Sequence, residues 1–487
     1  MKSILQSIIL LSLFFTHLSA TEINVPTNID SIILAKMNQY HFPGLQACIV
    51  KNDSIIWKSV YGYADIDSNK LVTDSTLFYL ASLSKPVTGT AIMQLWEEGL
   101  FGLDDDINNY LPFSVRNPSY PNDSITFRML LTHTSSIQDN WNLLNQLISW
   151  GMDYPEALDS FLNNYLLPGG NHYTSNNWYG YAPGSQYNYS NVGVSIIGLL
   201  VEILADTSFE NYCQDSIFVP LGMNETSWFL ANLNPNKIAT PYTYSGGNYT
   251  SNQHWGEPNY PSIQLRTSAT HLSKFLSMFI QMGQFQNTRI LDSSTVALMT
   301  TVQNPSLNPY MGLIWPVFNW NLPNVGDRTL CAYMGARRFG ANTCFGFIME
   351  MGENIGCIVM ANREYSDVWG NYGIVDIFSE LLAYGLLNYT GFEKNKTDIP
   401  LEYRLKQNYP NPFNPSTTIE FTLPKFEFTT LKVYNILGME VTTIISQKLN
   451  QGSHTYTFNG SNLASGIYYY QLVAGDYREV KKMILLK

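Results

Sequence analysis

The chain has 487 residues, and its 27 basic and 38 acidic side chains give a formal net charge of −11. This length allows two or three domains, each able to bury a core of its own. The acidic balance argues against a nucleic-acid partner, because nucleic-acid phosphates attract basic surfaces. Five cysteines are too few for a disulfide scaffold, and an odd number leaves at least one thiol free.

The first twenty residues have the pattern of a secretory signal peptide. Lys2 precedes the apolar residues 8–15, and the segment ends in Leu18-Ser19-Ala20. The apolar run is too short to span a bilayer, and no later segment reaches the ~20 apolar residues of a transmembrane helix. We therefore expect residues 1–20 to be a signal peptide, followed by an exported protein without a transmembrane segment.

The next part of the chain predicts a helix and then a pair of strands. Residues 30–39 have the pattern of a helix. Residues 46–50 and 54–60 are rich in β-formers and flank a turn at Asn52-Asp53, which predicts a β-hairpin.

The stretch Ser82-Leu83-Ser84-Lys85 lies at the start of a predicted helix that ends near Gly99. Residues three apart share a helix face, so Ser82 and Lys85 point the same way. A serine hydroxyl becomes a nucleophile when a neighbouring base takes its proton, and a partly buried lysine can be that base. The alternative is a helix-capping serine beside a solvated lysine.

We predict no metal site in the region after this helix. The acidic run Asp104-Asp105-Asp106 lacks the spacing and the terminal Glu of a calcium loop, so we interpret it as a solvated turn. The histidines are scattered and form no His-Glu-x-x-His pattern, and no metal or cofactor is expected. Residues 140–188, rich in Tyr, Asn and Gly, are expected to form the variable part of a binding cleft.

A second polar motif, Tyr189-Ser190-Asn191, follows a Gly-Ser turn and precedes an apolar helical run over residues 192–204. Tyr-x-Asn triplets also occur at Tyr120 and Tyr409, but those have proline in the middle and are typical of turns. The helix entrance singles out Tyr189, although a purely structural aromatic residue remains an alternative.

The later part of the first domain predicts three strands and a closing helix. Strands are expected at residues 330–335, 343–350 and 355–362, and a helix at about 375–387. Two strands early, three late and helices between them indicate an α+β domain, in which an antiparallel sheet is covered by helices.

Composition changes again near the C-terminus. Residues 388–406 are polar and are interpreted as a linker. Residues 407–487 contain alternating strand patterns with turns at Leu437-Gly438, Gln451-Gly452 and Ser465-Gly466, which predict a small β-sandwich.

Residues 29–387 resemble the β-lactamase-related serine hydrolases, which include class C β-lactamases, D-alanyl-D-alanine carboxypeptidases and family VIII esterases. The resemblance rests on stretches in a fixed order: Ser82-Leu83-Ser84-Lys85, Leu130-Leu131-Thr132-His133-Thr134-Ser135, Pro183-Gly184-Ser185, Tyr189-Ser190-Asn191 and Tyr333-Met334-Gly335-Ala336. It implies a penicillin-binding-protein-like fold and a covalent acyl-enzyme, with no cofactor.

The resemblance also implies a role for each motif residue. Ser82 attacks the carbonyl, while Lys85 and Tyr189 share the proton transfers, with Tyr189 expected to be the base in deacylation. Asn191 holds the lysine or the substrate amide. The backbone N–H groups of Ser82 and Ala336 form the oxyanion hole. For Tyr189 to act as a base, the lysine ammonium would have to lower its pKa from ~10 towards 7.

The sequence departs from this family in two places. Tyr333 and Met334, which precede Gly335, replace the usual Lys or His and the Ser or Thr of the substrate-binding strand, although Arg337 and Arg338 follow closely. Ser136 replaces a glycine. We therefore expect short neutral esters to be favoured over D-Ala-D-Ala peptides and β-lactams. The alternative is a catalytically inactive relative that serves as a surface-binding module.

The tail resembles the type A C-terminal sorting domain of type IX secretion, on residues 409–419, Leu437-Gly438, Ala464-Ser465-Gly466-Ile467-Tyr468 and a basic end. This implies the secretion machinery as a partner, and a secreted or surface location reached through the periplasm. A carbohydrate-binding or adhesive β-sandwich is the alternative.

The resemblance also predicts two close pairs of cysteines. Cys48 and Cys357 are expected on the paired first and last strands. Cys331 and Cys344 are expected to face each other across a hairpin. Whether either pair forms a disulfide depends on Cα separations that the sequence does not supply.

Overall fold

The computed structural model describes residues 29–350, 352–364, 373–389, 402–449 and 452–486. The chain divides into two compact units, Met1–Thr390 and Gly391–Lys487. The expected signal peptide (1–20) and residues 390–401 of the expected linker (388–406) lie outside the described residues.

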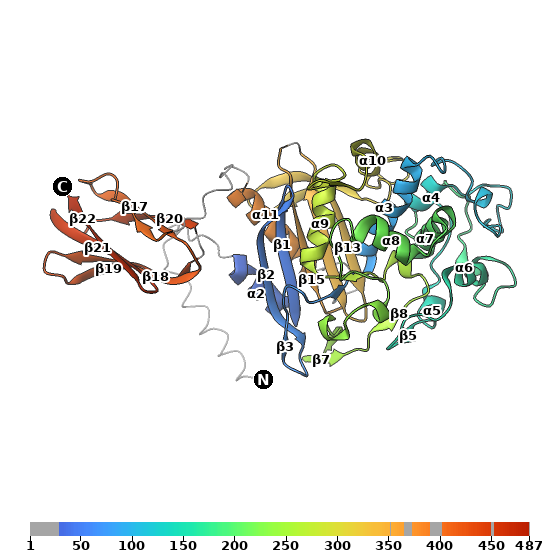
Figure 1. Cartoon of the computed structure of the whole chain (residues 1–487), viewed down its shortest axis with the longest axis horizontal. Coiled ribbons are helices and arrows are strands. Elements are labelled where there is room, and N and C mark those ends of the chain that lie inside the picture. Colours follow the sequence, from blue (N-terminus) through green and yellow to red (C-terminus); the bar gives the residue numbers. More distant parts are fainter. Residues whose placement is uncertain (1–28, 351, 365–372, 390–401, 450–451, 487) are drawn as a thin grey trace, which may run out of the picture. The chain divides into compact units, whose positions relative to one another are not determined.

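The first unit is built on a seven-stranded antiparallel sheet whose strands follow the order β12-β13-β14-β15-β1-β2-β3 (Figure 1). The first strand, β1, pairs with the last, β15, and in this register Leu45 lies opposite Ala361. The two ends of the unit therefore meet in one sheet, as predicted. The strand β12 was not predicted. The bounds are β1 (Gly44–Lys51), β2 (Ser54–Asp65), β3 (Lys70–Leu71), β12 (Val317–Leu322), β13 (Gly326–Arg337), β14 (Ala341–Ile348) and β15 (Ile355–Ala361).

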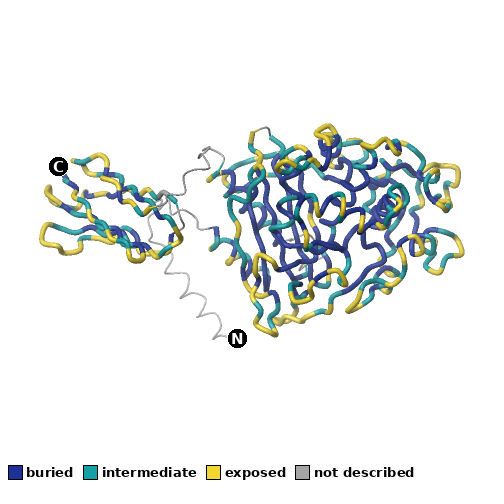
Figure 2. The backbone as a smooth tube through the Cα atoms, in the orientation of Figure 1, coloured by how far each residue is buried: buried dark blue, intermediate teal, exposed yellow. Residues whose placement is uncertain are grey.

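Each face of this sheet buries a separate core, because successive side chains of a strand point to opposite faces. On one face, Leu45, Ala47 and Ile49 pack with the terminal helices α2 (Ile29–Tyr40) and α11 (Gly373–Tyr389). On the other, Cys48 and Val50 join the core of α9 (Ala269–Ile280) and the helical region. Figure 2 shows the middle of the sheet as buried, and every described residue of β14 and β15 is buried.

The helical region lies on the α9 side of the sheet, and within it α3 packs on α7 (Figure 1). Its helices are α3 (Ser84–Glu97), α4 (Phe127–Leu131), α5 (Trp141–Leu144), α6 (Leu158–Leu166), α7 (Asn191–Ala205), α8 (Phe209–Cys213) and α10 (Ser293–Met299). Short strand pairs brace it: β4 (Phe78–Tyr79) with β9 (Arg266–Thr267), β5 (Ser149–Trp150) with β8 (Trp255–Gly256), β6 (Tyr242–Ser245) with β7 (Asn248–Ser251), and β10 (Gln284–Phe285) with β11 (Thr288–Arg289).

The second unit is a β-sandwich, as predicted. A sheet of order β16-β17-β20 and a sheet of order β19-β18-β21-β22 enclose one apolar core, to which Phe421 and Tyr470 contribute. The strands are β16 (Arg404–Leu405), β17 (Ser416–Leu423), β18 (Glu427–Asn435), β19 (Glu440–Leu449), β20 (Gly452–Asn459), β21 (Gly466–Ala474) and β22 (Tyr477–Leu485).

The predicted cysteine arrangement is only partly correct. Cys48 and Cys357 lie on the paired strands β1 and β15, but they face opposite cores. The predicted Cys331–Cys344 pair is wrong, because the register places Cys344 opposite Met334 and Cys331 opposite Phe347. All five cysteines are buried free thiols.

The acidic run lies in a turn with Asp104 exposed, as predicted, and its carboxylates also take part in a network of ion pairs and hydrogen bonds. Asp104 accepts a hydrogen bond from Arg128 at 2.7 Å, and Asp106 accepts one from Arg116 at 3.0 Å. Asp105 accepts from the Tyr110 hydroxyl at 2.7 Å. The basic partners come from 10 and 24 residues further along, so the local sequence gave no sign of them.

Within the described ranges, no single helix is long and apolar enough to cross a membrane, although the bent pair Asn191–Ala205 and Phe209–Phe218 passes the same test jointly.

Candidate active site

Ser82 lies in a tight turn that the surrounding backbone holds firmly. The 3₁₀ turn Ala81–Leu83 leads directly into α3, and Ala81 has a left-handed backbone with φ of 50°. The Ser84 hydroxyl donates to the Ala81 carbonyl at 2.7 Å and accepts from the Leu265 N–H at 3.0 Å. A left-handed non-glycine residue is sterically costly and persists only where its surroundings enforce it.

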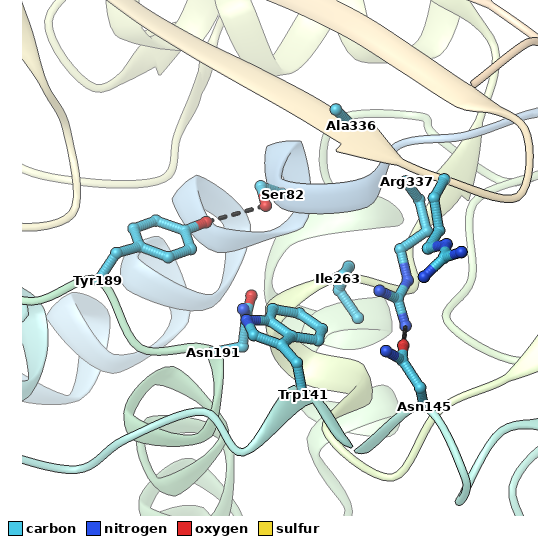
Figure 3. Close-up of a pocket in the computed structure, with 9 residues that line it drawn as sticks. Ser82, Trp141, Asn145, Tyr189, Asn191, Ile263, Ala336 and Arg337 are labelled. Carbon is cyan, nitrogen blue, oxygen red and sulfur yellow. Dashed lines mark hydrogen bonds between the residues drawn. The ribbon is translucent and has the colours of Figure 1, made fainter. Parts of the chain in front are cut away.

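Two polar side chains converge on the Ser82 hydroxyl. The Lys85 ammonium donates to Ser82 Oγ at 3.2 Å, from one helical turn further along. The Tyr189 hydroxyl donates to the same oxygen at 2.8 Å, from the segment before α7 (Figure 3). Two motifs more than 100 residues apart in the sequence therefore meet at one oxygen atom.

Lys85 is fully buried, which fits a base rather than a solvated surface lysine. Its Nζ also donates to Asn191 Oδ1 at 2.6 Å and to the Ser262 carbonyl at 2.8 Å. Burial lowers the Lys85 pKa from 10.5 to about 7, while the charges of Asp139 and Glu257 act in the opposite direction. The shift favours the neutral amine, which is the form that can accept a proton.

The pKa of Tyr189 moves opposite to the expected direction. Desolvation raises it above 10, and the hydrogen bond with Ser82 only partly offsets that effect. The Lys85 Nζ lies 4.7 Å from the centre of the Tyr189 ring, over its face, rather than at the phenol oxygen. The lysine is therefore the better proton acceptor of the two, and Tyr189 stays protonated.

Asn191, the first residue of α7, links the lysine to a carboxylate that sequence reasoning missed. Asn191 Nδ2 donates to Asp139 Oδ2 at 2.6 Å, while its Oδ1 accepts from Lys85. Asp139 is only 9% exposed. It lies 52 residues before Asn191, and no spacing rule connects the two.

The strand β13 passes directly against the nucleophile turn. A Cβ atom on Gly335 would lie 2.1 Å from the Leu80 carbonyl oxygen and 3.1 Å from the Ser82 nitrogen, so only glycine fits. The Thr343 hydroxyl ties the two elements together by donating to Leu80 O at 2.8 Å and to Gly335 O at 3.2 Å. Ala336, the next residue, lines the same pocket as Ser82.

Ser82 opens into a pocket of about 380 Å³. The expected cleft region, residues 140–188, contributes Trp141 and Asn145, although it also forms α5, β5 and α6 rather than only irregular chain. The remaining lining residues are Tyr189, Asn191, Ile263, Ala336, Arg337 and Arg338 (Figure 3).

The two arginines of the pocket differ in what they can offer a substrate. Arg337 is buried and makes two hydrogen bonds of 2.8 Å to Glu257, which is itself 1% exposed. Arg338 is exposed, lies 5.7 Å from the centre of the Phe339 ring, and acts through its charge on Glu364 without a close ion pair between the two. The positive charge that remains available in this pocket therefore belongs to Arg338.

Tyr333 lies behind the pocket rather than on its wall. It is 4% exposed, sits in the core that Tyr189 packs against, and interacts with the Tyr189 hydroxyl. The aromatic side chain that lines the pocket with Tyr189 is instead Trp141, which is 39% exposed. Met334, on the opposite face of β13, is 38% exposed.

Ser136, which replaces the glycine usual in this family, has a left-handed backbone with φ of 60°. Its hydroxyl accepts from Asn117 Nδ2 at 2.9 Å. The turn is therefore kept without glycine, at the cost of a strained residue.

Comparison with known proteins assigns both units. Residues 29–375 match the beta-lactamase family model, and residues 407–486 match the secretion system C-terminal sorting domain. Among curated proteins, protein flp of Staphylococcus aureus is 25% identical over 335 residues, which are 69% of this chain and 62% of flp. The match thus spans less than two thirds of that relative.

Two solved structures share the fold. The octameric penicillin-binding protein homologue from Pyrococcus abyssi aligns with a TM-score of 0.57 and 19% identity, over 93% of this chain and 99% of its own. EstCE1, a hydrolase with promiscuous acyltransferase activity, aligns with a TM-score of 0.57 and 18% identity, over 72% of this chain and 97% of its own.

The sorting domain makes this a secreted or cell-surface protein exported by type IX secretion. The family model covers most of the first unit, including every residue that converges on Ser82. The chain therefore belongs to the beta-lactamase family.

Proposed function

We propose that this protein is an exported serine hydrolase that cleaves an ester or amide through a covalent acyl-enzyme on Ser82. One observation carries the proposal: the Ser82 hydroxyl is contacted by a buried lysine at 3.2 Å and by a tyrosine hydroxyl at 2.8 Å. A hydroxyl flanked by a proton acceptor and a proton donor is suited to nucleophilic catalysis.

The charges of the site suggest how protons move. Neutral Lys85 takes the proton of Ser82 as Oγ attacks the substrate carbonyl, and the backbone N–H groups of Ser82 and Ala336 stabilise the oxyanion. Tyr189, kept protonated by burial, donates its proton to the leaving group and regains one from the Lys85 ammonium. Water then attacks the acyl-enzyme and gives one proton to Lys85, and the Lys85 ammonium returns that proton to Ser82 Oγ as the bond between Oγ and the acyl carbon breaks and the acid is released.

The pocket favours a neutral group next to the scissile bond. Tyr333 brings no charge where the family has Lys or His, and Arg337 is already neutralised by Glu257. A substrate carboxylate would have to reach Arg338 instead. We therefore propose short neutral acyl esters as the preferred substrates, ahead of D-Ala-D-Ala peptides and penicillins.

Labelling with a fluorophosphonate and with a tagged penicillin tests the proposal. Wild-type protein should form a covalent adduct that Ser82→Ala abolishes, whereas Ser306→Ala, an exposed serine in a loop, should label normally. A panel of p-nitrophenyl esters, penicillin and D-Ala-D-Ala peptides then ranks the substrates. If wild type and Ser82→Ala are equally inert on every probe and substrate, the protein is instead a surface-binding relative without activity.

A further inference from the structure

Asp139 lies one hydrogen bond behind Asn191 and is held entirely by donors at the start of α7. Its Oδ2 accepts from Asn191 N at 2.9 Å and from Asn191 Nδ2 at 2.6 Å. Its Oδ1 accepts from Val192 N at 3.0 Å and from Ser190 Oγ at 3.4 Å. The carboxylate is thus placed where free N–H groups of a helix stabilise negative charge.

This carboxylate fixes which way the Asn191 amide faces. Burial raises the pKa of the Asp139 carboxyl, while the hydrogen bonds from Val192 and Asn191 and the charge of Lys85 act in the opposite direction and favour the ionised form. An ionised carboxylate only accepts hydrogen bonds, so the NH₂ end of Asn191 points to Asp139. The carbonyl end then points to Lys85, and Lys85 only donates in its charged form. The chain Asp139–Asn191–Lys85–Ser82 therefore has one consistent direction from the carboxylate to the nucleophile.

We propose that Asp139 is a positioning residue for acyl transfer: through Asn191 it holds Lys85 against Ser82, and its negative charge sets the pH range in which Lys85 is a base. The inference rests on the proposed role of Lys85 as proton acceptor. Asp139 belongs to none of the three motifs around Ser82, Tyr189 and Gly335, so its assignment comes from the tertiary contacts alone.

The charged and titratable groups around Lys85 determine the sign of the effect. Asp139 and Glu257 face it with charges that favour the ammonium, and Glu257 is largely balanced by Arg337. His133, whose pKa burial lowers to about 3, is neutral in the working range. The Tyr189 ring covers the remaining side at 4.7 Å. Asp139 is therefore the unbalanced negative charge whose removal should make Lys85 a weaker base.

The direction of the pH shift follows from this arrangement. Acylation requires neutral Lys85, so its rate falls as pH drops through the lysine pKa. Loss of the Asp139 charge lowers that pKa, and the acidic limb should move to lower pH by about one unit for two groups separated by one amide. A carboxylate that merely capped α7 would change stability without moving the limb.

Three variants separate charge, orientation and helix capping. Asp139→Asn removes the charge but keeps an oxygen that can face Asn191. Asn191→Ala removes the amide bridge and leaves the backbone N–H contacts of Asp139. Glu210→Gln is the matched control, because Glu210 is 5% exposed and also accepts a backbone hydrogen bond, from Trp228 N at 3.1 Å, but does not act on Lys85.

Two measurements are made on each full-length variant. The rate of fluorophosphonate acylation is followed from pH 5 to 9. Separately, the Lys85 titration is followed by NMR on protein labelled with ¹³C-lysine, with the signal assigned by its loss in Lys85→Arg. The NMR titration requires no turnover, so it reports on Asp139 even if the proposed hydrolase activity fails the Ser82→Ala test.

We expect Asp139→Asn to lower both the Lys85 titration midpoint and the acidic limb by about one pH unit, with Glu210→Gln unchanged. Asn191→Ala should also lower the midpoint and reduce acylation at every pH, because Asn191 itself accepts a hydrogen bond from Lys85. Asp139→Ser is measured instead if Asp139→Asn does not fold. If the Asp139 variant titrates like wild type, Asp139 is only a helix cap and the inference is wrong.

Discussion

Replacing Glu257 by Gln should destabilise the first unit strongly, because it breaks a buried ion pair while leaving the Arg337 guanidinium in place. Glu257 is 1% exposed and Arg337 6% exposed, and two hydrogen bonds of 2.8 Å join them. The Glu257 carboxylate also accepts from Trp255 Nε1 at 2.7 Å and from the Tyr79 hydroxyl at 3.1 Å. Removing one partner of such a pair costs about 3–5 kcal/mol.

The loss can be measured by chemical and thermal unfolding. With roughly 2 cal/mol/K per residue, a unit of this size has an unfolding entropy near 0.8 kcal/mol/K, so about 4 kcal/mol corresponds to a fall of about 5 °C in Tm. The guanidinium chloride concentration at the midpoint of unfolding should fall in parallel. The acylation rate should also fall, because Arg337 lines the pocket beside Trp141.

Two controls make this prediction specific. Asp74→Asn breaks the Lys58–Asp74 pair, whose side chains are 45% and 54% exposed, and should cost no more than about 1 kcal/mol. The double variant Glu257→Gln/Arg337→Met leaves no isolated charge and should recover part of the lost stability. The reasoning is refuted if Glu257→Gln lowers the free energy of unfolding by no more than Asp74→Asn does. It is also refuted if the double variant has a lower free energy of unfolding than Glu257→Gln.

Three further outcomes are expected. Deleting residues 408–487 should leave esterase activity intact in the purified protein but retain it in the cell envelope, as followed by fractionation; full secretion of the truncated form would contradict the sorting role. Gly335→Ala should reduce the acylation rate at least 100-fold, because its Cβ would lie 2.1 Å from Leu80 O and would push β13 away from Ser82, and an unchanged rate would disprove that contact. Tyr333→Phe should leave the ratio of kcat/KM for neutral esters and D-Ala-D-Ala peptides unchanged, because Tyr333 is 4% exposed and does not line the pocket, and a ratio that changes by a decade would show that this side chain reaches the substrate.

Much of the fold could be predicted because its signals are local. The periodicity of α7 and the apolar strands β1, β14 and β15 are visible within short windows of sequence. The hairpin between β13 and β14 was expected, but its register was not. Cys344 pairs with Met334, three residues further along β13 than the expected Cys331. The register differs because the turn of the hairpin is centred beyond Arg338.

The candidate site divides in the same way. The order of Ser82, Lys85, Tyr189 and Asn191 along the chain was enough to nominate them, since each belongs to a short motif. The direction of the Tyr189 pKa shift could not be predicted from the sequence. Burial raises this pKa and outweighs the lysine charge that was expected to lower it. Desolvation depends on every atom around a side chain, and no motif records it.

The sequence by itself determined the two-unit plan, the nucleophile motif and the tail that directs export, since each is written in contiguous residues. Only the tertiary structure decided that Asp139 stands behind Asn191, that Arg337 is neutralised by Glu257, and that Trp141 rather than Tyr333 faces the pocket. Those contacts join residues 52 or more positions apart or depend on which face of a strand is buried. Their energies arise from burial and from the low effective dielectric of the interior, which exist only once the chain has folded.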